Sequence, residues 1–427
     1  MRIAVIGLGV VAISDALVLA RQHEVVLTGP LPDRVDAINA GALPISDPTV
    51  ADYVAQNALS LRATLDFDEA LKGAGMVLIS TPLPKDPERH GYRTAELDSR
   101  IEMAHERCPG VPIVIRSAVP IGYTEALRSR LKSRSILYAP EFMREGQSLQ
   151  DALSPAQIVI GDRGSLGEKV AEVFLNAALN PRIPVRRIGT AEAEAVKHFS
   201  QAYLATRVAY FNDLDSYAMT HGVDARKVIE GLCLDPRIGE GANNPCFGFG
   251  GQRLARSTAH LSEDFAALPA RILPSLARAN EARLDLLTRA VLDRGAERLG
   301  IFRPGDAGSD GDALGGLEAR LRGAGITVTH YTGAGEDEDF VRFKADCDLV
   351  IAQRMSPALA DIREKVFCRD LFAASFVTYR CTLTRPPVPG GRVSLSGRAP
   401  ALPFRAKAGS GRQIFFRRRA RRHPCKT

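Results

Sequence analysis

The sequence predicts an α/β protein in which two doubly wound domains are joined by a long central helix. Three observations predict this fold. The first half alternates short runs rich in Val and Ile with helical patterns, which is typical of parallel strands connected by helices. Residues 191–220 contain no Gly or Pro and repeat apolar residues every three or four positions, as one long helix does. Strand-like runs then return between residues 299 and 352.

The expected elements follow in chain order. In the first domain we expect strands at 2–6, 24–28, 76–80, 112–115, 135–138 and 157–160, and helices at 10–21 and 33–40. The central helix should place Val196, Phe199, Leu204, Val208 and Phe211 near one stripe, with more helix through residue 294. Strands at 299–302, 327–331 and 349–352 should build the second sheet. The 427 residues therefore divide into an N-terminal Rossmann-like domain (1–188), a central helical region (189–294), a C-terminal Rossmann-like domain (295–380) and a tail (381–427).

The basic charge of the chain is concentrated in this tail. The sequence has 56 Lys and Arg against 49 Asp and Glu, a net charge of +7. Residues 382–427 hold 12 of the basic residues and no acidic one, which leaves 44 basic and 49 acidic residues elsewhere, a net charge of −5. A mildly acidic body argues against a general nucleic-acid-binding role. Three interpretations of the tail stay open: a patch that binds nucleic acid or an anionic membrane, a solvated disordered end, or residues read in a shifted frame.

The cysteines and the hydropathy pattern indicate a cytoplasmic chain. The seven cysteines are scattered and never spaced C-x-x-C, so neither a disulfide framework nor a metal site is expected. This usage fits a reducing compartment. No stretch is expected to span a membrane.

The first candidate site is a glycine-rich turn that reads Gly7-Leu8-Gly9-Val10-Val11-Ala12. Gly7 permits a tight turn, Gly9 lets a pyrophosphate approach the backbone, and Ala12 takes the place of a third Gly where helix packs on strand. The N–H groups that open the helix, around Val11, then face the phosphates. The pattern indicates a dinucleotide-binding site.

The end of the second expected strand lacks the acid that an NAD site of this kind contains. An Asp or Glu about 20 residues after the glycines normally hydrogen-bonds the ribose hydroxyls. The sequence there reads Thr28-Gly29-Pro30, and no acid follows until Asp33. Because the loss of such a charged hydrogen bond costs about 1.5–3 kcal/mol, we expect NAD to bind weakly.

Five stretches of the chain resemble one family. They are MRIAVIGLGVVAIS at the start, VDAINAGALPI at 35–45, APEFMREG at 139–146, EAEAVKHFSQAYLATRVAYFNDLD at 192–215 and DPRIGEGANNPCFGFGGQRL at 235–254. Together they resemble the UDP-glucose/GDP-mannose dehydrogenase family, and within it the UDP-glucose 6-dehydrogenases of the short bacterial type. The similarity spans residues 1–375. It implies oxidation of the C6 alcohol of UDP-glucose to a carboxylate with two NAD, through a cysteine-bound intermediate, in a homodimer.

The resemblance assigns roles to individual residues. Glu145 matches the glutamate that positions water, Lys197 matches the lysine beside the reacting oxygen, and Arg237 matches an arginine that reaches the neighbouring subunit's substrate. The expected substrate site comprises Glu141, Phe142, Met143, Arg144, Lys197, Gln201, Arg237, Asn243, Asn244, Pro245, Cys246 and Gly250. The expected cofactor site comprises Gly7, Gly9, Val11, Ala12, Gly29, Arg34, Leu83, Ala118, Glu145 and Arg256. The alternative interpretation is that Glu145 is a solvated charge and that Lys197 is a helix-surface lysine.

The departures from the family fall in the catalytic loop. The family reads G-G-Y-C-L-P-K-D, whereas this chain reads Gly250-Gly251-Gln252-Arg253-Leu254-Ala255-Arg256-Ser257. Arg253 takes the position of the family's catalytic cysteine, the nucleophile. An arginine stays protonated and cannot act as a nucleophile. The family's threonines are Leu83 and Ala118 here, and its asparagine after the lysine is Gln201. Cys246 is a candidate substitute nucleophile, although a Cys there more often packs as a small apolar residue.

Three hypotheses remain from the sequence. The chain is an impaired or chemically altered dehydrogenase, a non-catalytic nucleotide-sugar binder that regulates or pairs with an active relative, or a product without a selected role.

Overall fold

The computed structural model describes residues 1–45, 47–84, 92–144, 146–249, 251–265, 268–304, 313–333, 335 and 337–372, without the side chains of 251–253, 256, 263 and 264. The tail therefore lies outside the described residues, and its three interpretations stay open. Within the described residues, no helix is both long and apolar enough to cross a bilayer.

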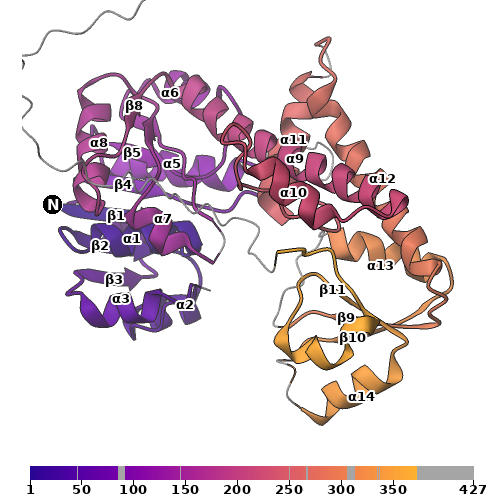
Figure 1. Ribbon diagram of the computed structural model, residues 1–427. Helices are drawn as coiled ribbons and strands as arrows, with labels where there is room; N and C mark the ends of the chain where they lie inside the picture. Colours follow the sequence, from indigo (N-terminus) through magenta and orange to yellow (C-terminus); the bar gives the residue numbers. More distant parts are fainter. Residues whose placement is uncertain are drawn as a thin grey trace, which may run out of the picture. The chain divides into compact units, whose positions relative to one another are not determined.

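The first sheet is parallel and doubly wound (Figure 1). Its strands are β1 (Arg2–Ile6), β2 (Glu24–Thr28), β3 (Leu61–Thr64), β4 (Met76–Ile79), β5 (Ile113–Ile115) and β6 (Ile136–Tyr138). Their spatial order is β3-β2-β1-β4-β5-β6. The order reverses between β1 and β4, and ligands of such sheets bind beyond the carboxyl ends of the strands at this reversal.

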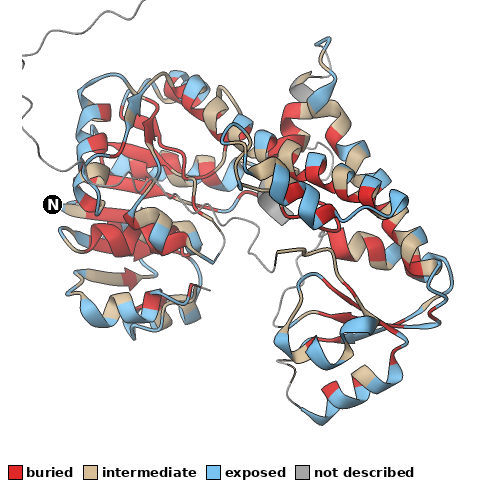
Figure 2. Cartoon of the chain, viewed as in Figure 1, coloured by how far each residue is buried: buried red, intermediate tan, exposed pale blue. Residues whose placement is uncertain are grey.

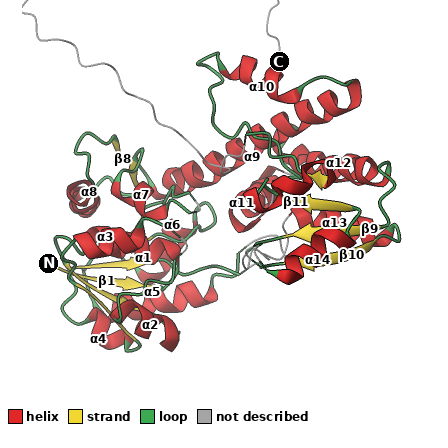
Figure 3. Ribbon diagram, turned by 60° about the horizontal axis from the view of Figure 1, so that its bottom comes forward, coloured by secondary structure: helices red, strands yellow, loops and turns green. Residues whose placement is uncertain are grey.

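Apolar residues cover both faces of the first sheet. Alternate residues of one strand point to opposite faces, and Ile3 and Val5 accordingly belong to one buried cluster while Ala4 and Ile6 belong to another. Figure 2 shows these strands as buried, and Figure 3 shows helices on both sides of them. The flanking helices are α1 (Val10–Leu19), α2 (Pro32–Asn39), α3 (Val50–Gln56), α4 (Phe67–Leu71), α5 (Ala95–Arg107), α6 (Tyr123–Leu131), α7 (Ser148–Leu153) and α8 (Ser165–Ala177). A separate parallel pair joins β7 (Ile158–Ile160) to β8 (Val185–Arg187).

The predicted long helix is confirmed as α9 (Thr190–His221). It ends where Gly222 adopts a left-handed conformation with φ of 67°, which glycine tolerates well. The expected apolar stripe is wrong in part: Val208 and Phe211 are buried, but Phe199 is 43% exposed. The buried face instead carries polar side chains, among them Lys197 and Asp215, because these find charged partners within the protein.

The remaining elements build the central region and the second sheet. They are α10 (Ala225–Cys233), α11 (Gly251–Asp264), α12 (Ile272–Leu292), β9 (Arg298–Phe302), α13 (Ala313–Gly323), β10 (Thr327–Tyr331), α14 (Glu338–Asp346), β11 (Leu349–Ala352), a 3₁₀ segment (Pro357–Lys365) and β12 (Val366–Phe367). The second sheet has the order β10-β9-β11-β12, and its described strand pairs are parallel. The predicted α/β class with two doubly wound domains is confirmed.

Candidate functional site

The glycine-rich turn closes tightly against the first sheet. Gly7 follows β1 with φ of 129°, and a Cβ atom there would lie 2.2 Å from the carbonyl oxygen of Ser80. Only glycine fits this position, because both the backbone angle and the space exclude a side chain. Gly9 precedes α1, and no side chain caps the start of that helix. The helix therefore presents backbone N–H groups to a ligand, as phosphate sites do.

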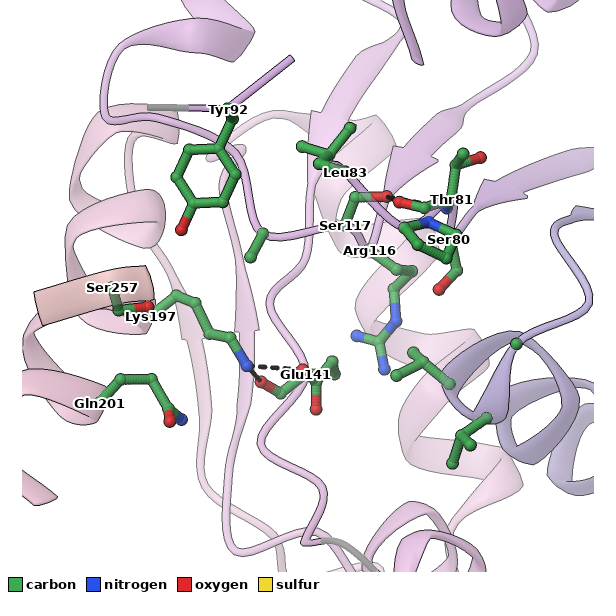
Figure 4. Close-up of a pocket in the computed structure, with 15 residues that line it drawn as sticks. Ser80, Thr81, Leu83, Tyr92, Arg116, Ser117, Glu141, Lys197, Gln201 and Ser257 are labelled. Atoms are coloured by element: carbon green, nitrogen blue, oxygen red, sulfur yellow. Dashed lines mark hydrogen bonds and ion pairs between the residues drawn. The ribbon is translucent and has the colours of Figure 1, made fainter. Parts of the chain in front are cut away.

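A pocket of about 290 Å³ lies directly beyond this turn (Figure 4). Its walls come from α1, from the segments that follow β4, β5 and β6, and from α9 and α11. The described lining residues are Gly9, Val10, Val11, Ser80, Thr81, Pro82, Leu83, Tyr92, Arg116, Ser117, Ala118, Glu141, Lys197, Gln201 and Ser257. The pocket thus occupies the carboxyl edge of the sheet, at the reversal of strand order where a dinucleotide is expected.

Seven of the predicted site residues meet in this pocket. They are Gly9, Val11, Leu83, Ala118, Glu141, Lys197 and Gln201. Gly7 and Ala12 lie just outside its lining, where they support the turn; Ala12 is buried. Glu145 and Gly250 fall outside the described residues, as do the side chains of Arg253 and Arg256. Position 253 lies in the first turn of α11, one turn before Ser257.

Lys197 and Glu141 both line the pocket and form a buried ion pair. Lys197 Nζ donates to both Glu141 Oε1 and the Glu141 carbonyl oxygen at 2.6 Å, as Figure 4 shows. The side chains are only 4% and 8% exposed. The other carboxylate oxygen accepts from the backbone N–H of Met143, and the ammonium lies 5.8 Å from the ring centroid of Phe142. The alternative of Lys197 as a helix-surface lysine is therefore wrong.

Arg116 was not predicted, although it lines the same pocket. It makes a bidentate ion pair with Asp15 of α1, with Nε and Nη2 at 2.7 and 2.9 Å from the carboxylate oxygens. Its Nη1 also donates to the carbonyls of Ala139 and Pro140, directly before Glu141. The guanidinium thus fixes the segment that carries Glu141. Sequence periodicity carries no signal for this pair, because Asp15 and Arg116 are 101 residues apart along the chain.

Ser257 enters the pocket next to an imidazole. Its Oγ lies 3.3 Å from Nδ1 of His198, and Nε2 of His198 donates to the Val119 carbonyl at 2.7 Å. The Nε2 donation leaves Nδ1 of a neutral imidazole to accept the Ser257 hydroxyl proton. The rings of Tyr92 and His260 pack around His198. The sequence does not predict this role of His198, because its partners Ser257 and Val119 are 59 and 79 residues away along the chain.

The described residues of the predicted sugar-nucleotide loop, 243–246, are not among the residues that line this pocket, and their side chains contact the protein itself. Asn244 Nδ2 donates to Asp370 Oδ1 at 2.6 Å, and Asn243 Nδ2 lies 3.2 Å from the Cys233 sulfur. Cys246 is 4% exposed, and burial raises the pKa of its thiol to about 11. Pro245 is buried beside it.

Arg144 and Arg237 also point their charges to partners within the chain. Arg144 forms a bidentate ion pair with Asp151. Arg237 is 88% exposed and pairs with Asp235 on the protein surface. Phe142 and Met143 flank the pocket segment without entering its described lining. Among the residues that the structure describes, no group of three His, Cys, Asp or Glu side chains is arranged to hold a metal ion.

The adenosine end of the site departs from an NAD site in its geometry as well as in its sequence. A Cβ atom on Gly29 would lie 2.7 Å from Cγ and 2.9 Å from Cδ1 of Leu8, and both residues are buried. The place of the missing acid is therefore filled by Leu8. Arg34 lies beside it and donates from Nη1 to the Leu8 carbonyl at 2.7 Å.

Comparison with protein families decides the identity of this fold and pocket. Residues 1–177 match the model of the UDP-glucose/GDP-mannose dehydrogenase family NAD binding domain, and residues 191–282 match the central domain of the same family. The chain belongs to this family. Residues 1–177 are thus its NAD-binding domain, and the dehydrogenases of the family use NAD.

Individual relatives agree with this assignment. A UDP-glucose 6-dehydrogenase of Streptococcus pneumoniae is 34% identical, over 87% of this chain and 99% of the relative. One from Campylobacter jejuni is 31% identical over the same shares. Among solved structures, the fold matches a UDP-glucose dehydrogenase from Pyrobaculum islandicum with a TM-score of 0.76 and 22% identity, over 86% of this chain and 94% of that one. A UDP-D-ManNAc dehydrogenase from Pyrococcus horikoshii gives a TM-score of 0.75 at 18% identity, over 91% and 97%.

Proposed function

We propose that this chain binds a nicotinamide dinucleotide and UDP-glucose, but that its double oxidation of UDP-glucose to UDP-glucuronate is impaired or lost. One observation carries the proposal. The pocket keeps the buried Lys197–Glu141 pair, yet none of its described lining residues is a cysteine. The position that holds the nucleophilic cysteine in the family is Arg253.

The missing thiol interrupts the reaction at a definite step. NAD accepts hydride when it is bound, and in this proposal Lys197 stabilises an oxyanion on the substrate. A thiolate is needed to hold the aldehyde as a thiohemiacetal for the second oxidation. Arg253 stays protonated at neutral pH and cannot form that bond. Removal of a covalent nucleophile lowers turnover by roughly 10⁴–10⁶.

Cys246 does not replace the nucleophile in this proposal. It packs in an apolar cluster with Ala205, Val208 and Phe249, outside the lining of the pocket. Its raised pKa leaves little thiolate at neutral pH, and the thiolate is the reactive form.

A second candidate function is that of a non-catalytic partner of an active relative. The long helix α9 favours association with a second polypeptide, either a relative or another copy of this chain, because Tyr203, Tyr210 and Tyr217 recur every seven residues and are 58%, 56% and 60% exposed. Apolar residues at this spacing form one stripe suited to a helix of another chain. We propose a homodimer formed through this stripe, and Arg237, exposed on the surface, would reach the partner's site as the family resemblance implies.

We propose that the domains of this chain are divided at 188/189, 294/295 and 380/381, as the sequence predicts. A cytoplasmic location is also proposed, supported by the scattered cysteines.

A thermal-shift titration tests binding. A ligand that binds only the folded chain raises its melting temperature as the ligand concentration rises. We expect a shift with millimolar UDP-glucose in a folded sample. The matched variant is Lys197→Arg, which keeps the charge opposite Glu141 but changes the shape of the donor; it should reduce the shift. No shift for the unmodified chain would count against the binding role.

A further inference from the structure

The carboxyl end of β2 determines which dinucleotide a Rossmann-like domain accepts. An acid at this end hydrogen-bonds the ribose 2′-hydroxyl of NAD, and it would repel a 2′-phosphate. A nearby arginine instead accommodates the 2′-phosphate of NADP. The charge that the β2–α2 connection of this chain presents to the ribose therefore determines whether NAD or NADP is preferred.

The acid is absent and its place is closed. β2 ends at Thr28 and is followed by Gly29 and Pro30. The side chain of Leu8 fills the space into which a side chain at position 29 would point. A ribose hydroxyl at this place meets no carboxylate from the strand end, so the main contact that selects NAD is missing.

The positively charged side chain of Arg34 lies next to Leu8, at the same end of β2. Arg34 lies in the first turns of α2, and its Nη1 donates to the Leu8 carbonyl in the glycine-rich turn at 2.7 Å. Within the described residues this is the hydrogen bond that its guanidinium makes, and no carboxylate pairs with it there. Asp33 and Asp36 are exposed near it and form no ion pair with it. A guanidinium has five N–H donors, so most of them remain for an anion.

We propose that this site binds a dinucleotide with a ribose 2′-phosphate, NADP, in preference to NAD. The inference rests on the proposed dinucleotide binding, and it concerns the ribose end alone. Arg34 is the specificity residue: its planar donors suit a phosphate, and the Leu8 carbonyl holds them at the glycine-rich turn. Leu8 and Gly29 act together, because Leu8 occupies the position that an NAD-selecting acid would need.

Calorimetric titration of the full chain tests this without turnover. NADP and NAD are compared, and so are 2′,5′-ADP and 5′-AMP, which carry the two ribose ends without nicotinamide and differ only in the 2′-phosphate. We expect NADP and 2′,5′-ADP to bind at least about tenfold more tightly than their counterparts, the effect of one charged hydrogen bond. The advantage should shrink as salt rises, since part of this site is exposed.

Variants of Arg34 show whether it is the cause. Arg34→Gln should abolish the tenfold advantage by weakening NADP far more than NAD, whereas Arg34→Lys should keep part of the advantage. The control variant is Arg134→Gln, which changes an exposed arginine that follows α6 and lies 100 residues from Arg34 along the chain. It should keep the whole advantage of NADP over NAD. Melting temperatures of the free variants establish that each one is folded.

The outcomes separate the inference from the proposed function. Equal or tighter binding of NAD by the unmodified chain overturns the inference alone. A 2′-phosphate advantage that survives in Arg34→Gln also overturns it. If neither dinucleotide binds a folded sample, the proposed function fails together with the inference.

Discussion

Restoring the NAD-selecting acid should require two substitutions, not one. Gly29→Asp alone places a Cβ atom 2.7 Å from Cγ of Leu8, closer than real contacts allow, in a buried corner. Overpacking of this kind destabilises a protein by about 1–3 kcal/mol. We therefore expect the single variant to be less stable and to bind NAD no better than the unmodified chain.

The double variant Leu8→Ala/Gly29→Asp removes the obstruction. It deletes Cγ and both Cδ atoms, and leaves the Leu8 Cβ at 3.7 Å from the new one, an ordinary contact. Leu8→Ala by itself costs about 2–5 kcal/mol, and the new carboxyl group refills part of that space. A carboxylate on the ribose hydroxyls should then tighten NAD by about 1.5–3 kcal/mol, or roughly 10–150-fold. NADP should weaken.

Urea unfolding and calorimetry of all four chains complete a double-mutant cycle. The expected cycle shows a favourable coupling between positions 8 and 29 in both stability and NAD affinity. Two results would refute the reasoning: Gly29→Asp alone as stable as the unmodified chain with tighter NAD binding, or a double variant that binds NAD no more tightly than Leu8→Ala.

Three further predictions follow from the site and from α9. Lys197→Met should destabilise the chain by about 3–5 kcal/mol in urea, because it leaves a buried carboxylate without its cation, and adding Glu141→Gln should restore part of the loss; no restoration would argue against the ion pair. Iodoacetamide at pH 8 should leave Cys246 unlabelled in the folded chain, because with a pKa of about 11 only about one thiol in a thousand is ionised; mass mapping checks this against a denatured control, and rapid labelling would contradict the buried thiol. Analytical ultracentrifugation should find a dimer that Tyr203→Glu/Tyr210→Glu converts to a monomer, whereas a monomeric unmodified chain would exclude the proposed interface.

The periodicity of the sequence predicts the main strands and α9 because these are long or fully buried. It misses β3, an edge strand whose first two residues, Leu61 and Arg62, are only partly buried. It also misses β8 and β12, which have three and two residues. Short edge strands bury too few side chains to leave an alternating pattern.

The polar part of the site was only half predictable. The family motif located Lys197 and Glu141, but Arg116 and His198 became visible only through their partners across the fold. Their burial depends on pairing between segments distant in sequence, which a local pattern does not record. The same holds for Leu8, because its side chain fills the space next to Gly29 only in the folded chain.

Product analysis with UDP-glucose tests the central claim most directly. The unmodified chain is incubated with UDP-glucose and either NAD or NADP, reduced cofactor is followed by absorbance, and the products are identified by mass. Arg253→Cys/Ser257→Asp, combined with Leu8→Ala/Gly29→Asp, is the gain-of-function control for NAD. We predict no UDP-glucuronate from the unmodified chain and measurable UDP-glucuronate from the combined variant. UDP-glucuronate from the unmodified chain at a turnover near roughly 1 per second, the low end for ordinary enzymes, would contradict the account.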